Sequence, residues 1–352
     1  MSEWADHGRG ASTPYAGGSA GAGAGGRGVY ERGRRRHRRG RTALIVVLVL
    51  LLLMIGVYFY LDSRLNRIDV FSDYNGRPAD TPGTNWLVVG SDSREGLSSA
   101  QRKDLHTGKA VGKRTDSMML LHIGDHGTTL VSLPRDSYVP IPGHDPNKLN
   151  AAYAFGGPKL LVRTVEQATK IHIDHYAEIG FGGFVGMVDA VGGVDMCIPQ
   201  RIKDTDAGID LKKGCQTLNG PQALGFVRTR HAFASQDLQR VQNQRKFLAA
   251  LTHKATSPGT LLNPFRIVPF VLRSTDDFSV DQGDHLYNVA GFAWAMRGLT
   301  KGDGLTTTVP IGGSGSSASA GAYITWDTTR AGELFRALRE DQPVPKSLRS
   351  TS

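Results

Sequence analysis

The sequence predicts a three-layer α/β/α domain with a mixed central sheet, preceded by one transmembrane helix. Short runs rich in β-branched and aromatic residues alternate with helical patterns from about residue 85 to 340. This alternation is typical of a sheet covered by helices on both faces. One long apolar run, residues 43–61, precedes them and holds no charged residue, Asn, Gln or Pro.

Residues 43–61 form the predicted membrane helix. At 1.5 Å per residue such a helix is about 28 Å long, close to the hydrocarbon thickness of a bilayer. Tyr58, Phe59 and Tyr60 at its far end suit the aromatic belt of a membrane interface. A cleaved signal peptide would have a shorter apolar core and small residues at its end. A helix buried in a soluble core would have a polar face. The membrane anchor is therefore the favoured interpretation.

The charges around this helix predict its orientation. Seven arginines lie between Arg32 and Arg41, directly before the apolar run, whereas the segment after it is mixed in sign. Positive charge remains on the cytoplasmic side, so we expect a cytoplasmic N-terminus and a folded domain outside the cytoplasm. The arginine run lacks interleaved aromatic residues, and its place before a membrane span accounts for it. Nucleic acid is therefore not an expected partner.

The chain divides into five predicted segments. Residues 1–42, rich in Gly, Ala and Arg, are expected to be a disordered basic cytoplasmic tail. Residues 43–61 are the transmembrane helix, and residues 62–84, which contain several turn residues, are expected to be a stalk. Residues 85–340 are expected to form the folded extracytoplasmic domain. Residues 341–352 are expected to be a flexible C-terminal tail.

The strands and helices of the domain follow from local patterns. The hairpin formed by residues 117–123 and 128–133 is antiparallel, because only four residues join its strands. Pro158 begins one helix, and Asp327 is placed to cap another. The predicted strands are Trp86–Val89, Ser117–Ile123, Thr128–Leu133, His175–Ile179, Val194–Ile198, Gly225–Arg228, Thr306–Val309 and Tyr323–Trp326. The predicted helices are Lys159–Thr169, Phe181–Val191, Asp237–Ala255 and Asp327–Arg339.

The chain has two cysteines, Cys197 and Cys215, both in the part expected outside the cytoplasm. An oxidising compartment favours a disulfide bond between them. A metal site is the alternative, but no further His or Cys lies at ligand spacing beside either residue.

Polar residues that interrupt the apolar patterns gather at the ends of predicted strands. Open α/β sheets bind ligands at such ends. Arginine suits phosphate oxygens, and two carboxylates suit Mg²⁺, which completes its coordination with phosphate and water. These residues together point to a pyrophosphate site. The segments that supply them are Gly90–Arg94, Lys113–Asp116, Pro134–Asp136, Lys148–Asn150, Phe226–His231, and Asp237, Arg240 and Gln244 at the start of a long helix.

The order and spacing of these segments resemble the LytR-CpsA-Psr family over about residues 85–255. The matching motifs are GSDSR (90–94), KRTDSMML (113–120), VSLPRDSYVPIPG (131–143), KLNAAYAFGGP (148–158), IDHYAEIGFGGFVGMVDAVGGV (173–194) and FVRTRHAFASQDLQRVQNQ (226–244). Members of this family are membrane-anchored phosphotransferases. The resemblance implies transfer of a glycan phosphate from a polyprenyl-pyrophosphate carrier to peptidoglycan, with a phosphodiester as product. It also implies a groove for the lipid tail beside the phosphate site.

The resemblance assigns roles by matching position. Asp92 and Asp116 are similar to the ligands of Mg²⁺ or Mn²⁺, and both are expected to be catalytic together with Arg114 and Asp237. Asp237 either orients Arg240 or assists deprotonation. The residues expected to bind pyrophosphate are Arg94, Arg114, Arg135, Lys148, Arg228, Arg230, Arg240 and Gln244. Gln236, Gln239, Asn243 and Arg245 depart from the usual family pattern, which affects substrate contacts rather than the reaction class.

Two other functions fit the same residues. A membrane-bound transcriptional regulator or attenuator would need the basic tail or the domain to read DNA. A polyprenyl-pyrophosphate hydrolase or lipid-binding module would keep the arginines but would not need an acceptor site. The expected partners of the transferase are a polyprenyl-pyrophosphate-linked glycan, peptidoglycan and membrane lipid.

Overall fold

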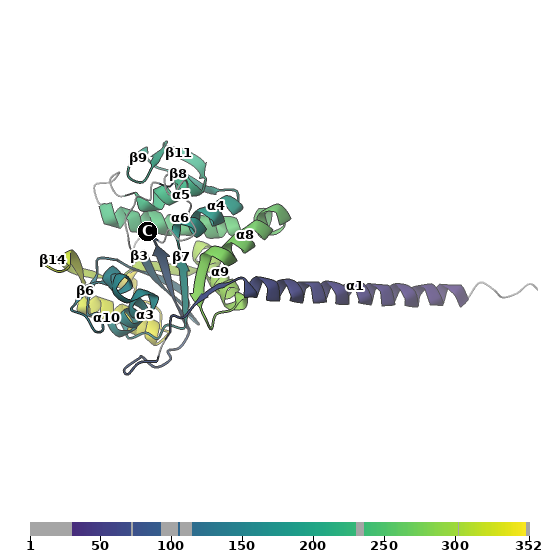
Figure 1. The fold of residues 1–352 in the computed structure, drawn as a ribbon, viewed down its shortest axis with the longest axis horizontal. Helices are drawn as coiled ribbons and strands as arrows, with labels where there is room; N and C mark the ends of the chain where they lie inside the picture. Colours follow the sequence, from purple (N-terminus) through teal and green to yellow (C-terminus); the bar gives the residue numbers. More distant parts are fainter. Residues whose placement is uncertain are drawn as a thin grey trace, which may run out of the picture. The chain divides into compact units, whose positions relative to one another are not determined.

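The computed structural model describes residues 30–71, 73–92, 105, 115–229, 236–301 and 303–349. The chain forms two compact units, Met1–Gly56 and Val57–Ser352 (Figure 1). The first unit consists of most of the helix α1 (Tyr30–Ser63). Its segment Gly40–Ser63 is long and apolar enough to cross a membrane, which fits a single-pass anchor. Residues 1–29 of the predicted tail lie outside the described residues, and residues 30–42, expected to be disordered, are helical instead.

A seven-stranded mixed sheet forms the centre of the second unit, and the mixed α/β fold class is thereby confirmed. Strands β1 and β12, β7 and β2, and β4 and β13 pair in parallel, whereas the other neighbours are antiparallel. In spatial order the strands are β1 (Asn66–Ile68), β12 (Phe278–Asp281), β7 (His175–Ile179), β2 (Thr84–Ser91), β3 (Thr115–Gly124), β4 (Gly127–Leu133) and β13 (Gly304–Thr308).

The predicted hairpin is the pair β3 and β4. Gly124 lies opposite Gly127, so Asp125 and His126 make a two-residue turn. Gly127 has a φ of +101°, a conformation that side chains with a Cβ rarely adopt. The turn is held from outside, because Asp125 N–H donates to the Asp341 carboxylate over 2.9 Å.

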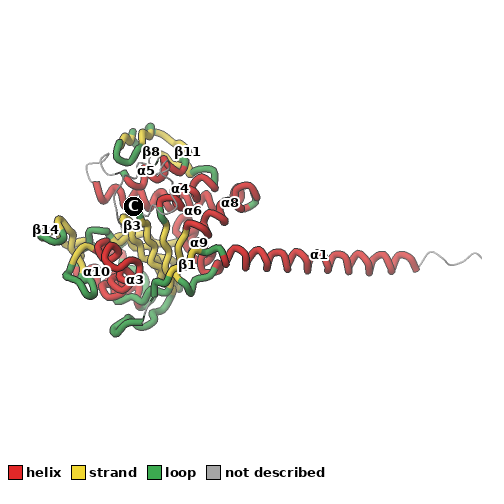
Figure 2. Tube along the Cα trace, viewed as in Figure 1, coloured by secondary structure: helices red, strands yellow, loops and turns green. Residues whose placement is uncertain are grey.

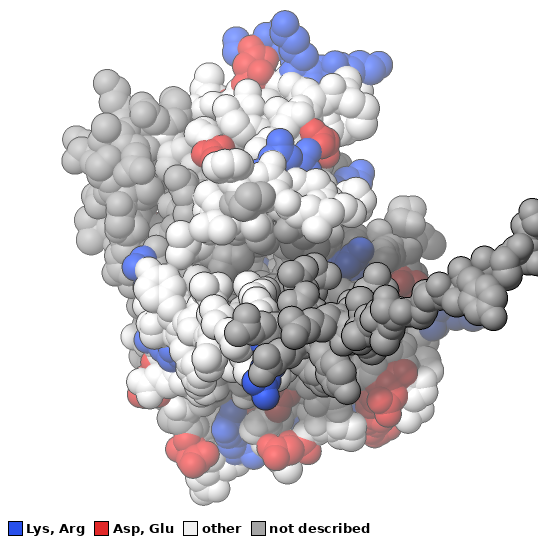
Figure 3. All heavy atoms as spheres, turned by 90° about the vertical axis from the view of Figure 1, so that its right-hand side faces the viewer, with Lys and Arg blue, Asp and Glu red and all other residues white. Residues whose placement is uncertain are grey.

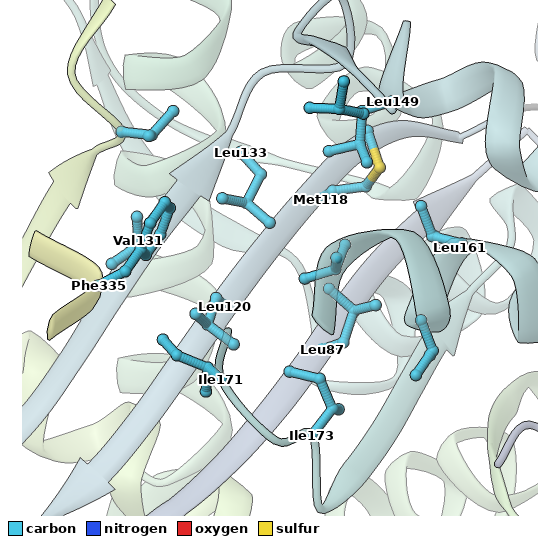
Figure 4. Close-up of a cluster of buried hydrophobic side chains, with 14 of the residues drawn as sticks. Leu87, Met118, Leu120, Val131, Leu133, Leu149, Leu161, Ile171, Ile173 and Phe335 are labelled. Carbon is cyan, nitrogen blue, oxygen red and sulfur yellow. The ribbon is translucent and has the colours of Figure 1, made fainter. Parts of the chain in front are cut away.

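Helices cover both faces of the sheet and complete three layers (Figure 2). The helices α3 (Leu149–Thr169) and α10 (Thr328–Arg339) pack on the face that carries Leu87, Leu120 and Val131 (Figure 4). The opposite face carries Trp86 and Leu121 and is covered by α9 (Leu286–Lys301) and α6 (Gln236–Ala255). Strand residues alternate between the two faces, so a central strand must be apolar throughout. Each fully buried Leu stabilises the fold by about 1.5–3 kcal/mol.

Helix α3 is interrupted where the sequence predicts a helix start. Gly156 and Gly157 leave the helical conformation, with φ +65° at Gly157, and the helix resumes at Pro158. Proline is tolerated in a first turn because its missing N–H has no partner there. The predicted helix Lys159–Thr169 is therefore the second part of α3.

A second apolar cluster lies between α4 (Phe181–Ala190), α5 (Gly220–Arg228) and α6. Two antiparallel strand pairs contribute to it: β8 (Val194–Ile198) with β11 (Gly214–Leu218), and the hairpin of β9 (Ile202–Asp204) with β10 (Ile209–Leu211). Cys197 and Cys215 lie opposite each other on β8 and β11 and are joined by a disulfide bond.

The predicted strand Gly225–Arg228 is wrong, because these residues end helix α5. Asn219 caps this helix: its side chain accepts from Gln222 N–H, and the Gln222 side chain accepts from Asn219 N–H. This reciprocal capping box starts a helix that buries Ala223 and Phe226 on one side. The four-residue run Gly-Phe-Val-Arg is too short for its periodicity to distinguish a strand from a helix end.

The segments predicted as a stalk and as a flexible C-terminal tail both contain residues packed into the domain. The segment expected as a stalk contributes β1 to the sheet and buries Leu65 and Val70. In the segment expected as a C-terminal tail, Leu348 is buried and its carbonyl accepts from the Thr307 hydroxyl over 2.7 Å. Apolar residues spaced singly among polar ones carry no periodic signal, although each fills a site on a larger core.

The remaining elements connect these layers. They are β5 (Tyr138–Val139) with β6 (Asn147–Lys148), α7 (Pro258–Leu261), α8 (Pro264–Asp277), the hairpin of β14 (Ile311–Ser317) and β15 (Gly321–Trp326), and a 3₁₀ turn at Lys346–Leu348. The side chain of Asp327 accepts from Thr329 N–H and Arg330 N–H, which confirms it as the cap of α10.

Glu166 is a buried carboxylate that ties the segment between β1 and β2 to α3. It accepts from Tyr74 Oη at 2.8 Å, Arg77 Nε at 3.1 Å and Ile173 N at 3.1 Å. Burial, and then this carboxylate, raise the pKa of the Tyr74 hydroxyl, which therefore stays a donor. The substitution Glu166→Ala should lower the free energy of unfolding by about 3–5 kcal/mol, because it leaves Arg77 without its buried partner. Urea unfolding of the detergent-solubilised chain measures this change.

The matched control is Asp210→Ala, which breaks the exposed ion pair between Arg201 and Asp210. Exposed pairs contribute little, since water screens both charges. If the two variants unfolded at the same denaturant concentration, Glu166 would not be the stabilising contact described here.

Candidate active site at the ends of the central strands

The polar residues predicted as a site follow neighbouring strands at one edge of the sheet. Gly90 of β2 pairs with Ser117 of β3 and with Ile179 of β7, so the end of β2 lies between the start of β3 and the end of β7. Leu133, the last residue of β4, pairs with Met118 of β3. The residues that continue from β2, β4 and β7 therefore emerge at the same edge of the sheet.

The two predicted metal ligands, Asp92 and Asp116, lie next to a β-bulge at this edge. Gly90 pairs with Ser117, but Ser91 pairs with Thr115, so Asp116 is an extra residue without a partner across the ladder. Asp92 directly follows Ser91. Bulges redirect side chains and are frequent beside active sites. The backbones of Asp92 and Asp116 thus lie on neighbouring strands, next to the same irregularity.

The residues at the bulge fit a hard cation. Ser91 is buried, and its hydroxyl has no hydrogen-bond partner among the described residues, so the site retains an oxygen able to bind a ligand. The part of the chain described contains no cluster of three or more His, Cys, Asp or Glu able to hold a metal alone. Two carboxylates are nevertheless enough for Mg²⁺, which keeps water and phosphate oxygens as its other ligands.

Asp136 holds two of the predicted cationic residues together. Its carboxylate pairs with Arg135 Nε at 3.3 Å and with Lys148 Nζ at 3.2 Å. The backbone joins the same segments, because Asn150 N–H donates to the Arg135 carbonyl and Tyr138 of β5 pairs with Lys148 of β6. A half-buried carboxylate between two cations fixes their positions and leaves the group with a net positive charge, which suits an anionic ligand.

Arg228 is held at the end of α5 by contacts on both sides. Its guanidinium lies 4.8 Å from the centre of the Phe181 ring and donates to the Leu105 carbonyl over 3.2 Å. The next residue, Thr229, is buried and donates to the Asp204 carboxylate over 2.7 Å. Phe181 begins α4 directly after β7, so Arg228 lies where a strand end meets a helix N-terminus. The free N–H groups of that helix start also favour an anion.

A buried carboxylate lies close to these strand ends, within the sheet. Glu178 of β7 lies opposite Val89 of β2, close to the end of both strands. The hydroxyls of Tyr153 and Tyr176 each donate to it at 2.7 Å. Burial, and then the charge of Glu178, raise the pKa of the Tyr176 hydroxyl well above its ordinary value, so it remains a donor.

The other predicted site residues are only partly described. Arg94, Arg114 and Arg230 lie outside the described residues, and only the backbone is described for Asp116, Asp237, Arg240 and Gln244. The last three lie on α6, which packs against α5. At spacing i, i+3 and i+7 they share one face of that helix. The structure therefore brings Asp92, Asp116, Arg135 and Lys148 to one sheet edge, with Arg228 beside the end of the neighbouring strand.

Sequence reasoning missed Asp136, Glu178 and Phe181 as parts of this site. Asp136 directly follows Arg135, and the pattern Pro-Arg-Asp is common in turns with a local ion pair. Its second partner, Lys148, becomes visible only when β5 and β6 pair. Glu178 is a lone carboxylate within the apolar run of β7, which is the available signal for a buried polar group with defined partners.

The chain is similar in sequence to a known family and to characterised cell-wall proteins. A family model described as the LytR_cpsA_psr family matches residues 62–336. The probable cell wall biosynthesis protein LcpB of Corynebacterium glutamicum is 50% identical over 285 residues, which cover 80% of this chain and 67% of that protein. The polyisoprenyl-teichoic acid–peptidoglycan teichoic acid transferase TagT of Bacillus subtilis is 37% identical over 180 residues, 49% of this chain and 52% of TagT.

A solved structure shares the fold. The LytR-Csp2A-Psr enzyme from Actinomyces oris superposes with a TM-score of 0.61 at 20% identity, covering 78% of this chain and 96% of that one. The relatives are longer than the matched region: about two thirds of LcpB and about half of TagT correspond to this chain.

Arg135 and Arg228 should both contribute to anion binding. Replacing either by Ala removes charge-assisted hydrogen bonds, which contribute about 1.5–3 kcal/mol each, so affinity for inorganic pyrophosphate should fall about ten- to hundredfold. Titration calorimetry of the full chain in detergent measures this affinity. The control Arg201→Ala removes an exposed arginine that pairs with Asp210. An equal loss in the control would show that net charge alone, and not this site, binds the anion.

Proposed function

The chain belongs to the LytR-CpsA-Psr family, and from this premise we propose that it transfers a glycan phosphate from a polyprenyl-pyrophosphate carrier to peptidoglycan. A general role in the transfer of cell-wall glycopolymers is supported by relatives named as a cell wall biosynthesis protein and as a teichoic acid transferase. The observation that carries the finer proposal is the meeting of Arg135, Lys148 and two aspartate positions at one edge of the sheet.

The proposed reaction joins a hydroxyl of peptidoglycan, that of muramic acid C6, to the glycan-linked phosphorus. A new P–O bond forms to the acceptor oxygen, the P–O bond to the lipid phosphate breaks, and the hydroxyl loses its proton to a base. Asp237 on α6 is a candidate for that base, or for a group that orients Arg240. Lipid phosphate leaves. The two products, together with the proton released to the base, carry all atoms of the two substrates.

The cationic side chains supply the electrostatics of this reaction. Negative charge grows on the bridging oxygen of the leaving phosphate as the P–O bond breaks. Arginines held in advance by other protein groups stabilise that charge without reorganising at the moment of reaction. Asp136 holds Arg135 and Lys148 in this way, and Phe181 holds Arg228. Mg²⁺ or Mn²⁺ held by Asp92 and Asp116 would neutralise phosphate oxygens when bound.

A membrane anchor would keep the folded unit at the same membrane as the proposed lipid-linked substrate. A polyprenyl carrier stays in the bilayer and presents its pyrophosphate at the surface. The arginine run before the apolar segment favours a cytoplasmic N-terminus, which would leave the folded unit outside the cytoplasm, where peptidoglycan lies. A C-terminal alkaline phosphatase fusion tests this orientation, since the enzyme is active only outside the cytoplasm.

Transfer should depend on Arg228 and on a divalent cation. With the full chain, a polyprenyl-pyrophosphate glycan and peptidoglycan, Arg228→Ala should lower kcat about a hundred- to thousandfold, as expected for loss of a group that stabilises the transition state. Asp92→Asn should cause a loss of similar size, and chelation by EDTA should abolish transfer until Mg²⁺ is restored. Covalent attachment of glycan to peptidoglycan is the quantity to measure.

Two results would contradict the transferase. Equal release of lipid phosphate with and without peptidoglycan would indicate a hydrolase. Retained transfer in both Arg228→Ala and Asp92→Asn would place the reaction elsewhere. Arg201→Ala, on the exposed surface of the same unit, serves again as the control with unchanged activity.

A further inference from the structure

Two helices that flank β12 in the sequence present large apolar side chains to solvent. Helix α8 runs directly into β12, and α9 begins five residues after it. At the start of α8, Phe265 is 88% exposed and Leu262, just before it, is 82% exposed. On α9, Trp294 is 72% exposed and Tyr287 is 61% exposed. Exposure of single apolar residues is common, but four large ones in the two segments that flank β12 are more than scattered exposure accounts for.

These side chains lie on outer faces of helices that are already packed on their inner faces. On α9, Ala295 and Met296 are buried against the sheet, while Tyr287 and Trp294, seven residues apart, share the opposite face. On α8, Phe270 packs on the cluster around α4, and Val268 remains exposed on the outside. The folded unit therefore does not need these outer residues for its own core.

The end of the membrane helix is joined to this surface. The carboxylate of Asp62 accepts from Leu286 N–H over 2.7 Å and pairs with Arg67 at 2.8 Å. Leu286 begins α9, and Tyr287 is the next residue. The strand that follows the membrane helix, β1, pairs with β12, which connects α8 to α9. The exposed face of α9 thus begins next to the last residues of α1.

The charges of the two segments suit an anionic lipid surface. Residues 258–275 and 286–301 contain no Asp or Glu, whereas they contain Arg266, Arg273, Arg297 and Lys301. The acidic residues of α8, Asp276 and Asp277, are its last two, at the end that joins β12 and not at the end that carries Phe265. Arg297 lies 5.4 Å from the Trp294 ring centre. Trp and Tyr prefer the interface between lipid headgroups and acyl chains, and basic residues beside them pair with lipid phosphates. In Figure 3, basic and acidic side chains are both scattered over the described surface of one side of the molecule, and acidic ones are more frequent toward its lower edge.

We propose that the outer faces of α8 and α9 form a second membrane contact, in which Leu262, Phe265, Tyr287 and Trp294 enter the bilayer interface. This contact is separate from the transmembrane helix and holds the folded unit against the lipid surface. It does not depend on the proposed reaction.

The test measures the depth of single spin labels on the full chain in vesicles of phosphatidylcholine and phosphatidylglycerol. Cys197 and Cys215 are joined in a disulfide bond, so only an introduced cysteine reacts. Phe265→Cys and Trp294→Cys place labels on the proposed surface. Ile311→Cys, on β14 at the opposite side of the folded unit, places a label at an exposed apolar position away from it (Figure 1).

We expect the labels at positions 265 and 294 to collide with oxygen, which concentrates in the lipid, more than with a water-soluble nickel chelate. The label at position 311 should collide more with the chelate. A water-like value at either position 265 or 294 would overturn the proposal. Protection that disappears when the protein is diluted in lipid would also overturn it, because it would reveal contact with a second copy of the chain. All three positions are exposed, so the substitutions should leave the fold intact.

Discussion

Strand β2 is the element on which the rest of the folded unit depends. It is buried on both faces, with Leu87 and Val89 on one side and Trp86 on the other, and it pairs with β3 and β7. One antiparallel and one parallel neighbour fix its register twice. A slip by one residue would exchange Trp86 with Leu87 between two cores that are already close-packed, so side-chain packing on both faces selects one register. The core therefore fixes the ends of β2, β3 and β7 relative to one another. The register of these strands also positions the polar residues that follow them.

The same edge contains the features that a purely structural sheet would avoid. The extra residue Asp116 interrupts the ladder, Ser91 is buried without a hydrogen-bond partner among the described residues, and Asp136 is confined between two cations. A buried hydroxyl without a partner costs about 1–3 kcal/mol. Glu178 on the neighbouring strand, by contrast, is fully satisfied by two tyrosines. The unpaired and charged groups are thus confined to the ends of the strands. The neighbouring buried carboxylate, Glu178, has hydrogen-bond partners.

The strands with strong β-branched content, the β3–β4 hairpin, the membrane helix and the cap at Asp327 all follow from local rules, and the sequence predicts them. The helix that ends at Arg228 does not, because its capping box at Asn219 lies upstream of the apolar run that resembles a strand. Leu65, Val70 and Leu348 were equally hidden, since their burial comes from partners far away in the sequence. In the site, the single residues could be found from strand ends, but the pairing of Asp136 with Lys148 requires the contact between β5 and β6.

The segment that follows the apolar helix is part of the folded unit. The Asp62 carboxylate accepts from Leu286 N–H, and β1 joins the sheet. Farther on, Tyr74 and Arg77 bind Glu166 at the end of α3. Contacts therefore lead from the last turn of the membrane helix, through edge strand β1, to β12 and then to β7, whose end borders the candidate site. A continuous packed path of this kind transmits position, because close-packed elements do not deform freely. The residues that end the membrane helix consequently belong to the scaffold that positions the site.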